Sequence, residues 1–274
     1  MWRLNTKRLV QGALVPLAVI GVWHWMAASG FVNPQILPTP GAVLVRWFVY
    51  LKPCEPFDPA KTSYIAWFFS GELLCDAAAS LYRIIVGFVI GAGLALLLGL
   101  LMGANETIYK LFNPLIQILR PIPPIAFIPL SILWFGLGNP PAIFLITLGA
   151  FFPVLMNTIS GVRHVDAIYI RAARNLGANK TTLFLRVILP AAAPYILAGA
   201  RIGVGTAFIV VIVAEMIAVN NGLGYRILEA REFMWSDKII AGMFTIGLIG
   251  LAIDTGMNRL NSHLLKWHRG MESR

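Results

Sequence analysis

A stretch of 42 consecutive residues, from Pro121 to Val162, carries no charged side chain. One helix needs only about 20 apolar residues to cross a bilayer. Of the 274 residues in the chain, 58% are hydrophobic and 12% are charged. Soluble domains have about 45–50% apolar and about 25% charged residues, so a soluble fold is excluded, as are a disordered chain and a disulfide-rich module. Because lipid offers the backbone no hydrogen-bond partners, the sequence predicts an all-α, polytopic membrane protein.

Six apolar segments are predicted to span the membrane, at residues 9–28, 84–105, 111–135, 142–161, 191–219 and 239–256. Four prolines between 121 and 129 are expected to break or kink the third span. The first segment follows three basic residues and could be a cleaved signal peptide, but its length favours a retained helix. A short helix with one apolar face, around 43–51, fits the membrane interface.

The charges of the loops predict how the spans are oriented. The loop 162–190 has five basic residues against one acidic residue, and both ends of the chain are basic. The first outer loop, residues 30–74, and the loop 220–238 have balanced charges. Since cytoplasmic loops carry an excess of Lys and Arg, we expect both termini and the loop 162–190 in the cytoplasm. The net charge of +10 then reflects topology and not nucleic-acid binding, and residues 1–274 form a single transmembrane domain.

The segment from Asp166 to Pro190 has the pattern of a helix–turn–helix. Asp166 is a typical residue before a helix start, and Gly177 is a typical residue after a helix end. A second helical segment is expected from Thr181 to Val187, and Pro190 is expected to open the fifth span. Composition alone also allows a solvated basic loop.

The order Arg171-Ala-Ala-x-x-x-Gly177, then nine residues, then Val187-x-Leu-Pro190 resembles the EAA loop of bacterial ABC importer permeases. In that family the loop forms a coupling helix that docks into a groove on the ATPase subunit. The resemblance implies ATPase-coupling roles for Arg171, Ala172, Ala173, Gly177, Leu189 and Pro190. Arg171 stands where the family usually has Glu, so the role of that acid does not carry over.

Further motifs extend the resemblance over nearly the whole chain. They are Leu37-Pro-Thr-Pro40, Ser80-Leu-Tyr-Arg83 with Gly87-Phe88, the segments 120–129 and 134–138, and Ala214-Glu215. These motifs are similar to the nitrate/sulfonate/taurine/bicarbonate permease family, and the segments 120–129 and 134–138 most resemble its taurine and alkanesulfonate branch. Residues 53–72 look like an insertion, and we assign them no role.

The resemblance implies the membrane-spanning subunit of an ATP-driven ABC importer for a small oxyanion, with a type I permease architecture, in a bacterial inner membrane. The implied mechanism is alternating access. The implied partners are a second copy of the permease or a homologous permease, two ATPase subunits that hold ATP and magnesium, an outer substrate-binding protein and membrane lipid.

The chain itself has no pattern of a nucleotide site or a catalytic site. The nearest Walker-like string, 177–181, lacks the required glycines, and no nucleophile has His and Asp partners in one context. We therefore expect a non-catalytic subunit that binds no cofactor and no metal. A stand-alone secondary anion transporter or channel, with Glu215 in proton coupling, is the alternative, but it gives no reason for an EAA-like loop.

Polar residues inside the predicted spans are candidates for the substrate path, because charge in a span is costly and often functional. The candidates are Arg120, Ser131, Asn157, Arg201, Thr206 and Glu215. Arg201 and Glu215 lie 14 residues apart, about 21 Å along a helix, so they cannot pair with each other. Either one could instead extend its charged end toward the membrane surface (snorkelling) or form a structural pair with Arg83, Arg120 or Asp254.

Small residues and cysteines give two further expectations. Gly-x-x-x-Gly pairs at 87/91, 99/103 and 199/203 are expected to let helices approach closely. Cys54 and Cys75 both fall on the expected outer side, where a disulfide can form if their Cα atoms come within about 7 Å. Two free thiols are the alternative.

Overall fold

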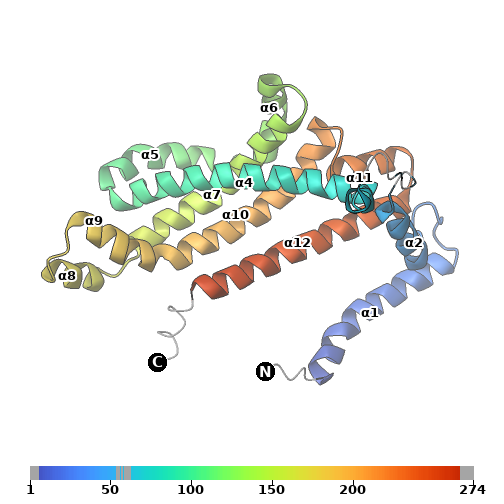
Figure 1. Cartoon of the computed structure of the whole chain (residues 1–274), viewed down its shortest axis with the longest axis horizontal. Coiled ribbons are helices and arrows are strands. Elements are labelled where there is room, and N and C mark those ends of the chain that lie inside the picture. The colour runs from blue at the N-terminus through green and yellow to red at the C-terminus, as the bar shows by residue number, and fades with distance from the viewer. Residues whose placement is uncertain (1–5, 54–55, 57, 59–62, 266–274) are drawn as a thin grey trace. The chain divides into compact units, whose positions relative to one another are not determined.

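The computed structural model describes residues 6–53, 56, 58 and 63–265, with the side chains of 6–11, 65 and 66 left out. Helices joined by short turns make up most of this part of the chain (Figure 1). The chain divides into two compact units, which we describe one at a time. The first unit contains residues up to Ala77 together with Arg226–Ile246, and the second contains Ala78–Tyr225 and the residues from Gly247 onward.

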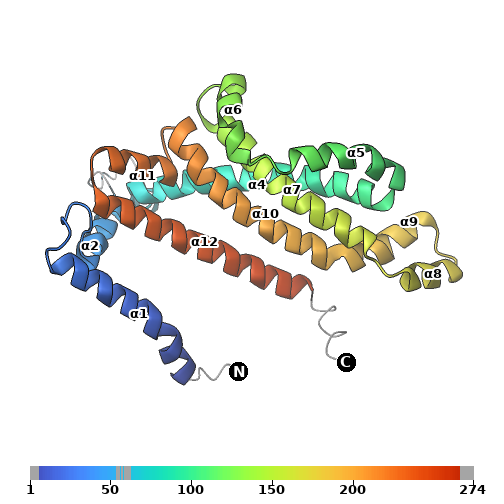
Figure 2. The same cartoon turned by 180° about the vertical axis from the view of Figure 1, so that it is seen from behind.

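Three long helices form the centre of the second unit: α4 (Glu72–Ala104), α7 (Asn139–Arg163) and α10 (Leu189–Ala218). The chain between α4 and α7 forms α5 (Glu106–Leu119), the 3-10 turn η1 (Pro124–Phe127) and α6 (Ile128–Phe135). The chain between α7 and α10 forms α8 (Ala167–Asn175), α9 (Lys180–Leu183) and the π-helical turn η2 (Phe184–Ile188). Figures 1 and 2 show α8 and α9 at one end of α7 and α10, and α6 near their other end.

The first unit contains the N-terminal helices and the residues that follow α10. Its helices are α1 (Thr6–Ala28), α2 (Pro40–Leu51), α3 (Tyr64–Phe68), the start of α4, most of α11 (Leu223–Glu232) and the first part of α12 (Ser236–Leu264). The side chain of Thr39 accepts a hydrogen bond from the N–H of Ala42, and Pro40 occupies the first turn, so α2 begins where both residues favour a helix start. The helix predicted around 43–51 is thereby confirmed.

Most of the predicted spans are present as helices. Four helical segments are long and apolar enough to cross a membrane: Glu72–Ala104, Asn139–Arg163, Lys180–Ala218 and Ser236–Leu264. The predicted third span is a bent pair, in which α5 and the segment Pro124–Phe135 meet at 81°, so the break expected from the prolines is confirmed. The predicted first span corresponds to α1, whose described apolar part, Gly12–Ala28, is shorter than these four.

Two predicted boundaries were wrong. The second span was expected from residue 84, but α4 already begins at Glu72, whose carboxylate is paired with basic side chains of the same unit. Pro190 was expected to open the fifth span, and it does lie in the first turn of α10, but the helical run of this span already begins at Lys180 and continues to Ala218. The N–H of Leu189 donates to the carbonyl of Phe184, five residues back, so the turn before Pro190 widens into a π-helix and does not end.

Glycines bring α4 and α10 into close contact with α7. A Cβ added to Gly91 would lie 2.4 Å from the carbonyl oxygen of Thr147, and one added to Gly199 would lie 2.6 Å from the Cβ of Asn157. The other glycines of the predicted pairs also face α7 at short distances. The packing role of the Gly-x-x-x-Gly pairs is confirmed, because any larger residue would force the helices apart.

This close packing predicts that Gly91→Ala destabilises the protein while Gly93→Ala does not. Gly93 lies on the same helix, and a Cβ there would meet no atom within 4 Å. Overpacking costs about 1–3 kcal/mol, whereas replacing an exposed glycine within a helix by alanine gains about 0.5–1 kcal/mol. We expect a lower melting temperature in detergent for Gly91→Ala and an equal or higher one for Gly93→Ala. Equal melting temperatures for the two variants would contradict the α4–α7 contact.

Candidate functional site

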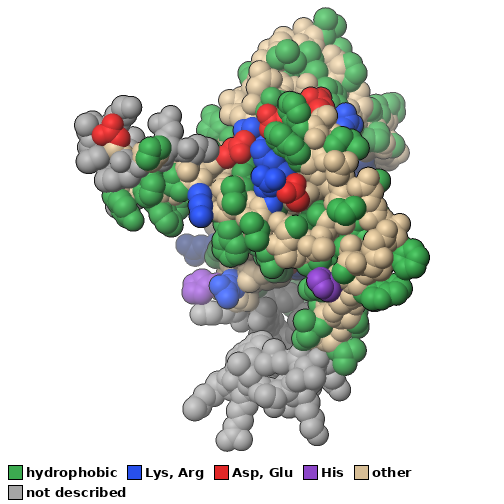
Figure 3. Space-filling model, turned by 90° about the vertical axis from the view of Figure 1, so that its right-hand side faces the viewer, with side chains coloured by type: hydrophobic (Ala, Val, Ile, Leu, Met, Phe, Trp, Pro, Cys, Tyr) green, Lys and Arg blue, Asp and Glu red, His purple; other side chains and the backbone are tan. Residues whose placement is uncertain are grey.

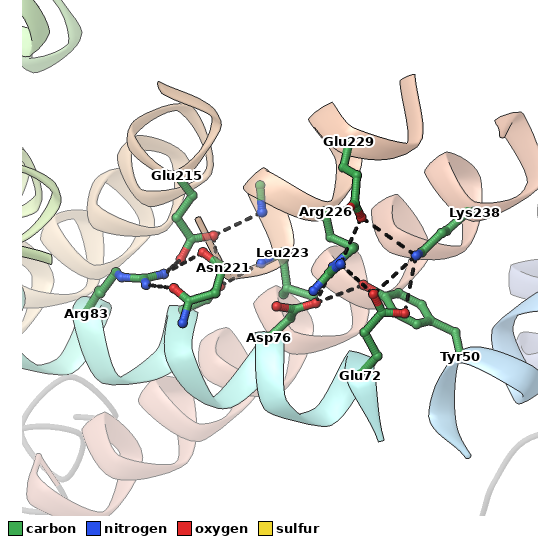
Figure 4. A network of polar contacts seen from close by, with 12 residues as sticks. Tyr50, Glu72, Asp76, Arg83, Glu215, Asn221, Leu223, Arg226, Glu229 and Lys238 are labelled. Carbon is green, nitrogen blue, oxygen red and sulfur yellow. Dashed lines mark hydrogen bonds and ion pairs between the residues drawn. The ribbon is translucent and has the colours of Figure 1, made fainter. Parts of the chain in front are cut away.

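A buried ion pair between Arg83 and Glu215 lies at one end of the second unit (Figure 4). The Arg83 Nη1 donates to the Glu215 Oε1 at 2.6 Å, and the two side chains are 2% and 0% exposed. The other carboxylate oxygen accepts hydrogen bonds from the Ser80 hydroxyl and the Gly224 N–H, both at 2.9 Å. Glu215 is therefore enclosed and paired, which matches its predicted alternative as a structural pair with Arg83.

The remaining donors of Arg83 join further chain segments to this pair. Its Nε donates to the side-chain oxygen of Asn139, the first residue of α7, at 2.7 Å. Its Nη1 also donates to the carbonyl oxygen of Asn221 at 3.1 Å, and its Nη2 donates to the Asn221 side chain. Gly222 has a φ of +106°, and a Cβ there would lie 2.5 Å from the carboxylate of Glu215. The loop after α10 thus folds around the carboxylate and requires a glycine at this position.

Arg83 is one of the three partners expected for Glu215 from sequence, whereas the contacts of Ser80, Asn139 and Asn221 were not expected. The spacing of Ser80 and Arg83 could have indicated that both contact the same partner, because residues three apart lie on the same face of a helix. The contribution of Asn139 and Asn221 could not be found from sequence, since both are far from α4 along the chain.

Three of the six candidate path residues line one cavity of about 350 Å³. Arg120 comes from the break between α5 and η1, Asn157 comes from α7, and Thr206 comes from α10. Apolar side chains form much of the remaining wall. The Arg120 N–H donates to the carbonyl of Ile116 at 2.9 Å, but its guanidinium makes no hydrogen bond or ion pair with another residue in the described part of the chain. The cavity therefore contains one available positive charge.

Asn157 and Thr206 can also contribute to binding in this cavity. The Asn157 amide nitrogen donates to the carbonyl of Pro153 at 2.8 Å, and its second N–H remains for a ligand. The Thr206 hydroxyl donates to the carbonyl of Ile202 at 3.0 Å, which leaves its oxygen as an acceptor. A single guanidinium with a few neutral polar groups suits a small anion that must also be released.

The other three candidate path residues lie elsewhere. Ser131 is fully buried, and its hydroxyl donates to the carbonyl of Ile128 within α6. Arg201 forms an ion pair of 2.8 Å with Asp254, and both side chains are about half exposed. Glu215 belongs to the buried pair with Arg83. For Arg201 as well, the structure has the predicted structural pair.

The loop 162–190 has the predicted helix–turn–helix form. The Asp166 side chain accepts from the N–H of Ile168 at 2.8 Å at the start of α8. Gly177 has a φ of +81°, and the N–H of Ala178 donates to the carbonyl of Ala173 at 3.0 Å, so the helix ends in a glycine-dependent turn. No residue of α8 is buried, and Leu176 at its end is 88% exposed. Ile168 and Leu176 are thus apolar side chains that the described part of the chain leaves largely uncovered.

The coupling candidates are distributed over this loop and the start of the fifth span. Arg171 and Ala172 are exposed and Ala173 is half-buried on α8, whereas Leu189 is half-buried and Pro190 exposed at the start of α10. The predicted disulfide involves Cys54, which lies outside the described residues, so it stays a prediction. Cys75 is exposed on the first turn of α4.

A network of opposite charges in the first unit accounts for the balanced charges of the loops 30–74 and 220–238. Arg226 on α11 pairs with Glu72 at 2.5 Å, with Asp76 at 2.8 Å and with Glu229 at 2.8 Å, and Lys238 pairs with Glu72 at 3.2 Å (Figure 4). The space-filling view shows acidic and basic side chains gathered among apolar ones (Figure 3).

These pairs fix the charge states of the network. Burial raises the pKa of the Tyr50 phenol, and the nearby carboxylate of Asp76, which accepts its hydrogen bond at 3.1 Å, raises it further. Burial opposes the charge of Arg226, but hydrogen bonds to Asp76 and Glu229 outweigh it, and the pKa of Arg226 is raised. Tyr50 therefore stays neutral and Arg226 stays charged at physiological pH.

The two ion pairs of the second unit predict a contrast in stability. Glu215→Gln leaves a buried guanidinium without its counter-charge, and breaking a buried pair costs about 3–5 kcal/mol. Asp254→Asn breaks the half-exposed pair with Arg201, and exposed pairs contribute about 0–1 kcal/mol. We expect a large drop in melting temperature for Glu215→Gln and a small one for Asp254→Asn. Similar drops would contradict the burial of the Arg83–Glu215 pair.

Comparison with known proteins agrees with this arrangement. Residues 91–269 match the family described as binding-protein-dependent transport system inner membrane component. The taurine transport system permease protein of Escherichia coli is 35% identical, over 97% of this chain and 93% of that protein. The nitrate import permease protein of Synechococcus elongatus is 33% identical, over 84% of this chain and 81% of that protein.

A solved chain of the MetNI methionine ABC transporter, in an inward-facing conformation, has the same fold. It superposes with a TM-score of 0.63 at 19% identity, over 74% of this chain and 99% of that chain. Because the sequence identity is only 19%, this comparison shows a shared fold and nothing about function. From the family match and the relatives together, the chain belongs to the binding-protein-dependent inner-membrane components and is a permease subunit of an ABC importer.

Proposed function

We propose that the cavity lined by Arg120, Asn157 and Thr206 belongs to the path of a small oxyanion. The observation that supports this most is the unpaired guanidinium of Arg120 in a cavity of about 350 Å³. Ligand cavities commonly have about 300–1,000 Å³ with a few polar groups on an apolar wall. The functions named for the two relatives, taurine transport and nitrate import, both concern small molecules with an anionic oxygen group. A taurine-like or alkanesulfonate-like substrate, or nitrate or bicarbonate, fits this chemistry.

We expect the anion to bind only weakly in this cavity. One guanidinium can hold an oxyanion through two N–H donors, and the second N–H of Asn157 can add a third hydrogen bond. A second unpaired cation would hold the anion too strongly for transport, and the only other arginine of the predicted path, Arg201, is already paired with Asp254.

A secondary transporter that uses Glu215 for proton coupling is not favoured. A coupling carboxylate must reach water to take up and release its proton. The Glu215 side chain is 0% exposed and is held by Arg83, Ser80 and the N–H of Gly224. Glu215 instead serves to hold helices together.

We further propose that α8 is the coupling helix and docks on a partner ATPase, with two ATPase subunits holding ATP and magnesium. The exposed side of α8 and the uncovered Leu176 support a docking role. A second permease chain, identical or homologous, and an outer binding protein complete the importer. The excess of basic residues in the loop 162–190 supports a cytoplasmic position for this loop and for both termini, in a bacterial inner membrane.

The anion path is tested by Arg120→Gln in the complete importer reconstituted in proteoliposomes. Hydrogen bonds to charged groups contribute about 1.5–3 kcal/mol, so we expect uptake of the anion at low concentration to fall about 10- to 100-fold. Arg259→Gln removes one positive charge near the end of α12, outside the cavity, and serves as the matched control. Uptake that falls equally in both variants, or in neither, would reject the proposed path.

The coupling role is tested at Gly177 by comparing Val with Asn. No atom lies within 4 Å of an added Cβ at Gly177, so the backbone alone decides the outcome. Asn tolerates a positive φ, whereas a β-branched residue there is strained by about 1–3 kcal/mol. We expect Gly177→Val to reduce substrate-stimulated ATP hydrolysis by the complex about tenfold or more. Gly177→Asn should remain close to the parent protein, and full activity of the Val variant would contradict the assignment.

A further inference from the structure

A second cavity, of about 410 Å³, lies between the two ends of the loop 162–190. It is bordered by the end of α7, the start of α8, the turn η2 and the start of α10, all within the second unit. Neither the anion path nor the proposed contact with the ATPase accounts for it. Both ends of the coupling loop line this cavity, so a ligand there would contact both of them.

Several hydrogen-bond donors of this cavity have no partner in the described part of the chain. Arg186, from η2, makes no ion pair or side-chain hydrogen bond with another described residue. The same holds for the hydroxyls of Tyr169 and Tyr195, whose residues are 58% and 45% exposed. One guanidinium and two phenol groups together provide several hydrogen-bond donors. Such a set suits a ligand with several acceptor oxygens.

His164 and Asp166 are the other titratable residues that line the cavity, and hydrogen bonds to the backbone hold both side chains. The Nδ1 of His164 lies 2.8 Å from the carbonyl oxygen of Ser160, and because a carbonyl can only accept, this nitrogen carries the proton. The ring of His164 stacks on that of Tyr195 with centroids 6.2 Å apart. Asp166 is the acidic residue of the lining, and its Oδ1 is occupied by the N–H of Ile168 at the start of α8, where the helix dipole favours a negative charge.

The position of the cavity favours a lipid over a solute. It lies beside Gly161 and His164, at the end of the candidate span Asn139–Arg163, and valine, alanine and proline side chains complete its wall. The end of a span is expected at the level of the lipid headgroups. The loop 162–190 has five basic residues against one acidic residue, and such basic surroundings attract anionic lipids. Tyrosine is also enriched at the membrane interface, where its ring meets apolar chains and its hydroxyl meets polar groups.

We infer that this cavity binds the phosphate group of an anionic phospholipid of the adjacent leaflet. Arg186 provides the charge, the hydroxyls of Tyr169 and Tyr195 donate to the remaining phosphate oxygens, and the apolar wall contacts the glycerol and upper acyl region. A bound lipid connects the end of α7 to η2 and so braces the coupling loop. This inference goes beyond the proposed function, and its test requires no transport.

The test measures lipid retention by the purified full-length chain in detergent, with native mass spectrometry as the readout. Phosphatidylglycerol and phosphatidylcholine are added separately, and we expect the anionic lipid to be retained preferentially. Arg186→Gln should weaken retention of phosphatidylglycerol about fivefold. Arg174→Gln removes the same charge from the same loop but outside the cavity, and we expect it to retain the lipid within about twofold of the parent chain.

A variant that keeps every charge separates the cavity from general electrostatics. Ala191 lines the cavity, and Ala191→Trp fills it, so this variant should also lose phosphatidylglycerol about fivefold. Equal losses for Arg186→Gln and Arg174→Gln, or full retention by Ala191→Trp, would overturn the site. Inorganic phosphate is tested in a parallel arm. If it displaces phosphatidylglycerol completely at millimolar concentration, the cavity is a free-anion site and the lipid assignment is wrong.

Discussion

The pairing of Arg83 with Glu215 is the interaction on which the second unit depends. A lone charge within a membrane span is costly, so neither residue can be accommodated unless the other is in place. The pair forms only where α4, α10 and the start of α7 meet, since Asn139 completes the hydrogen bonds of Arg83. The glycine contacts between these helices bring the two charges within 2.6 Å. Charge pairing and close packing therefore impose the same arrangement of the three helices.

The elements that the sequence predicted well are those determined by local chemistry. The apolar runs predict the long helices, the prolines predict the break in the third span, and Asp166 and Gly177 predict the limits of α8. Each of these signals depends on residues that are close along the chain. The start of α4 was missed because Glu72 is stabilised there by Arg226, which is far away in sequence.

Only three of the six candidate path residues line a common cavity, for a similar reason. The presence of a polar side chain inside a predicted span identifies six residues. This criterion does not distinguish a side chain that is available to a ligand from one that already has a protein partner. Arg201 and Glu215 have such partners in Asp254 and Arg83, and Ser131 bonds within its own helix. Arg120 remains unpaired within the described residues because the bend after α5 places it beside α7 and α10. The bend was predictable, but its consequence for Arg120 required the tertiary structure.

The continuity of the helix from Lys180 to Ala218 constrains how a displacement of the loop 162–190 is transmitted to the cavity that Arg120 lines. This run of 39 residues would extend about 58 Å as a straight helix, with η2 near one end and Glu215 near the other. Its backbone is weakest near the loop, because the π-turn and two prolines, Pro190 and Pro194, interrupt the regular hydrogen bonds there. Beyond Pro194, the close contacts of Gly199 and Gly203 attach α10 to α7. We therefore expect bending before these contacts. Beyond them, we expect α7 and α10 to move together, along with Asn157 and Thr206, which line the cavity.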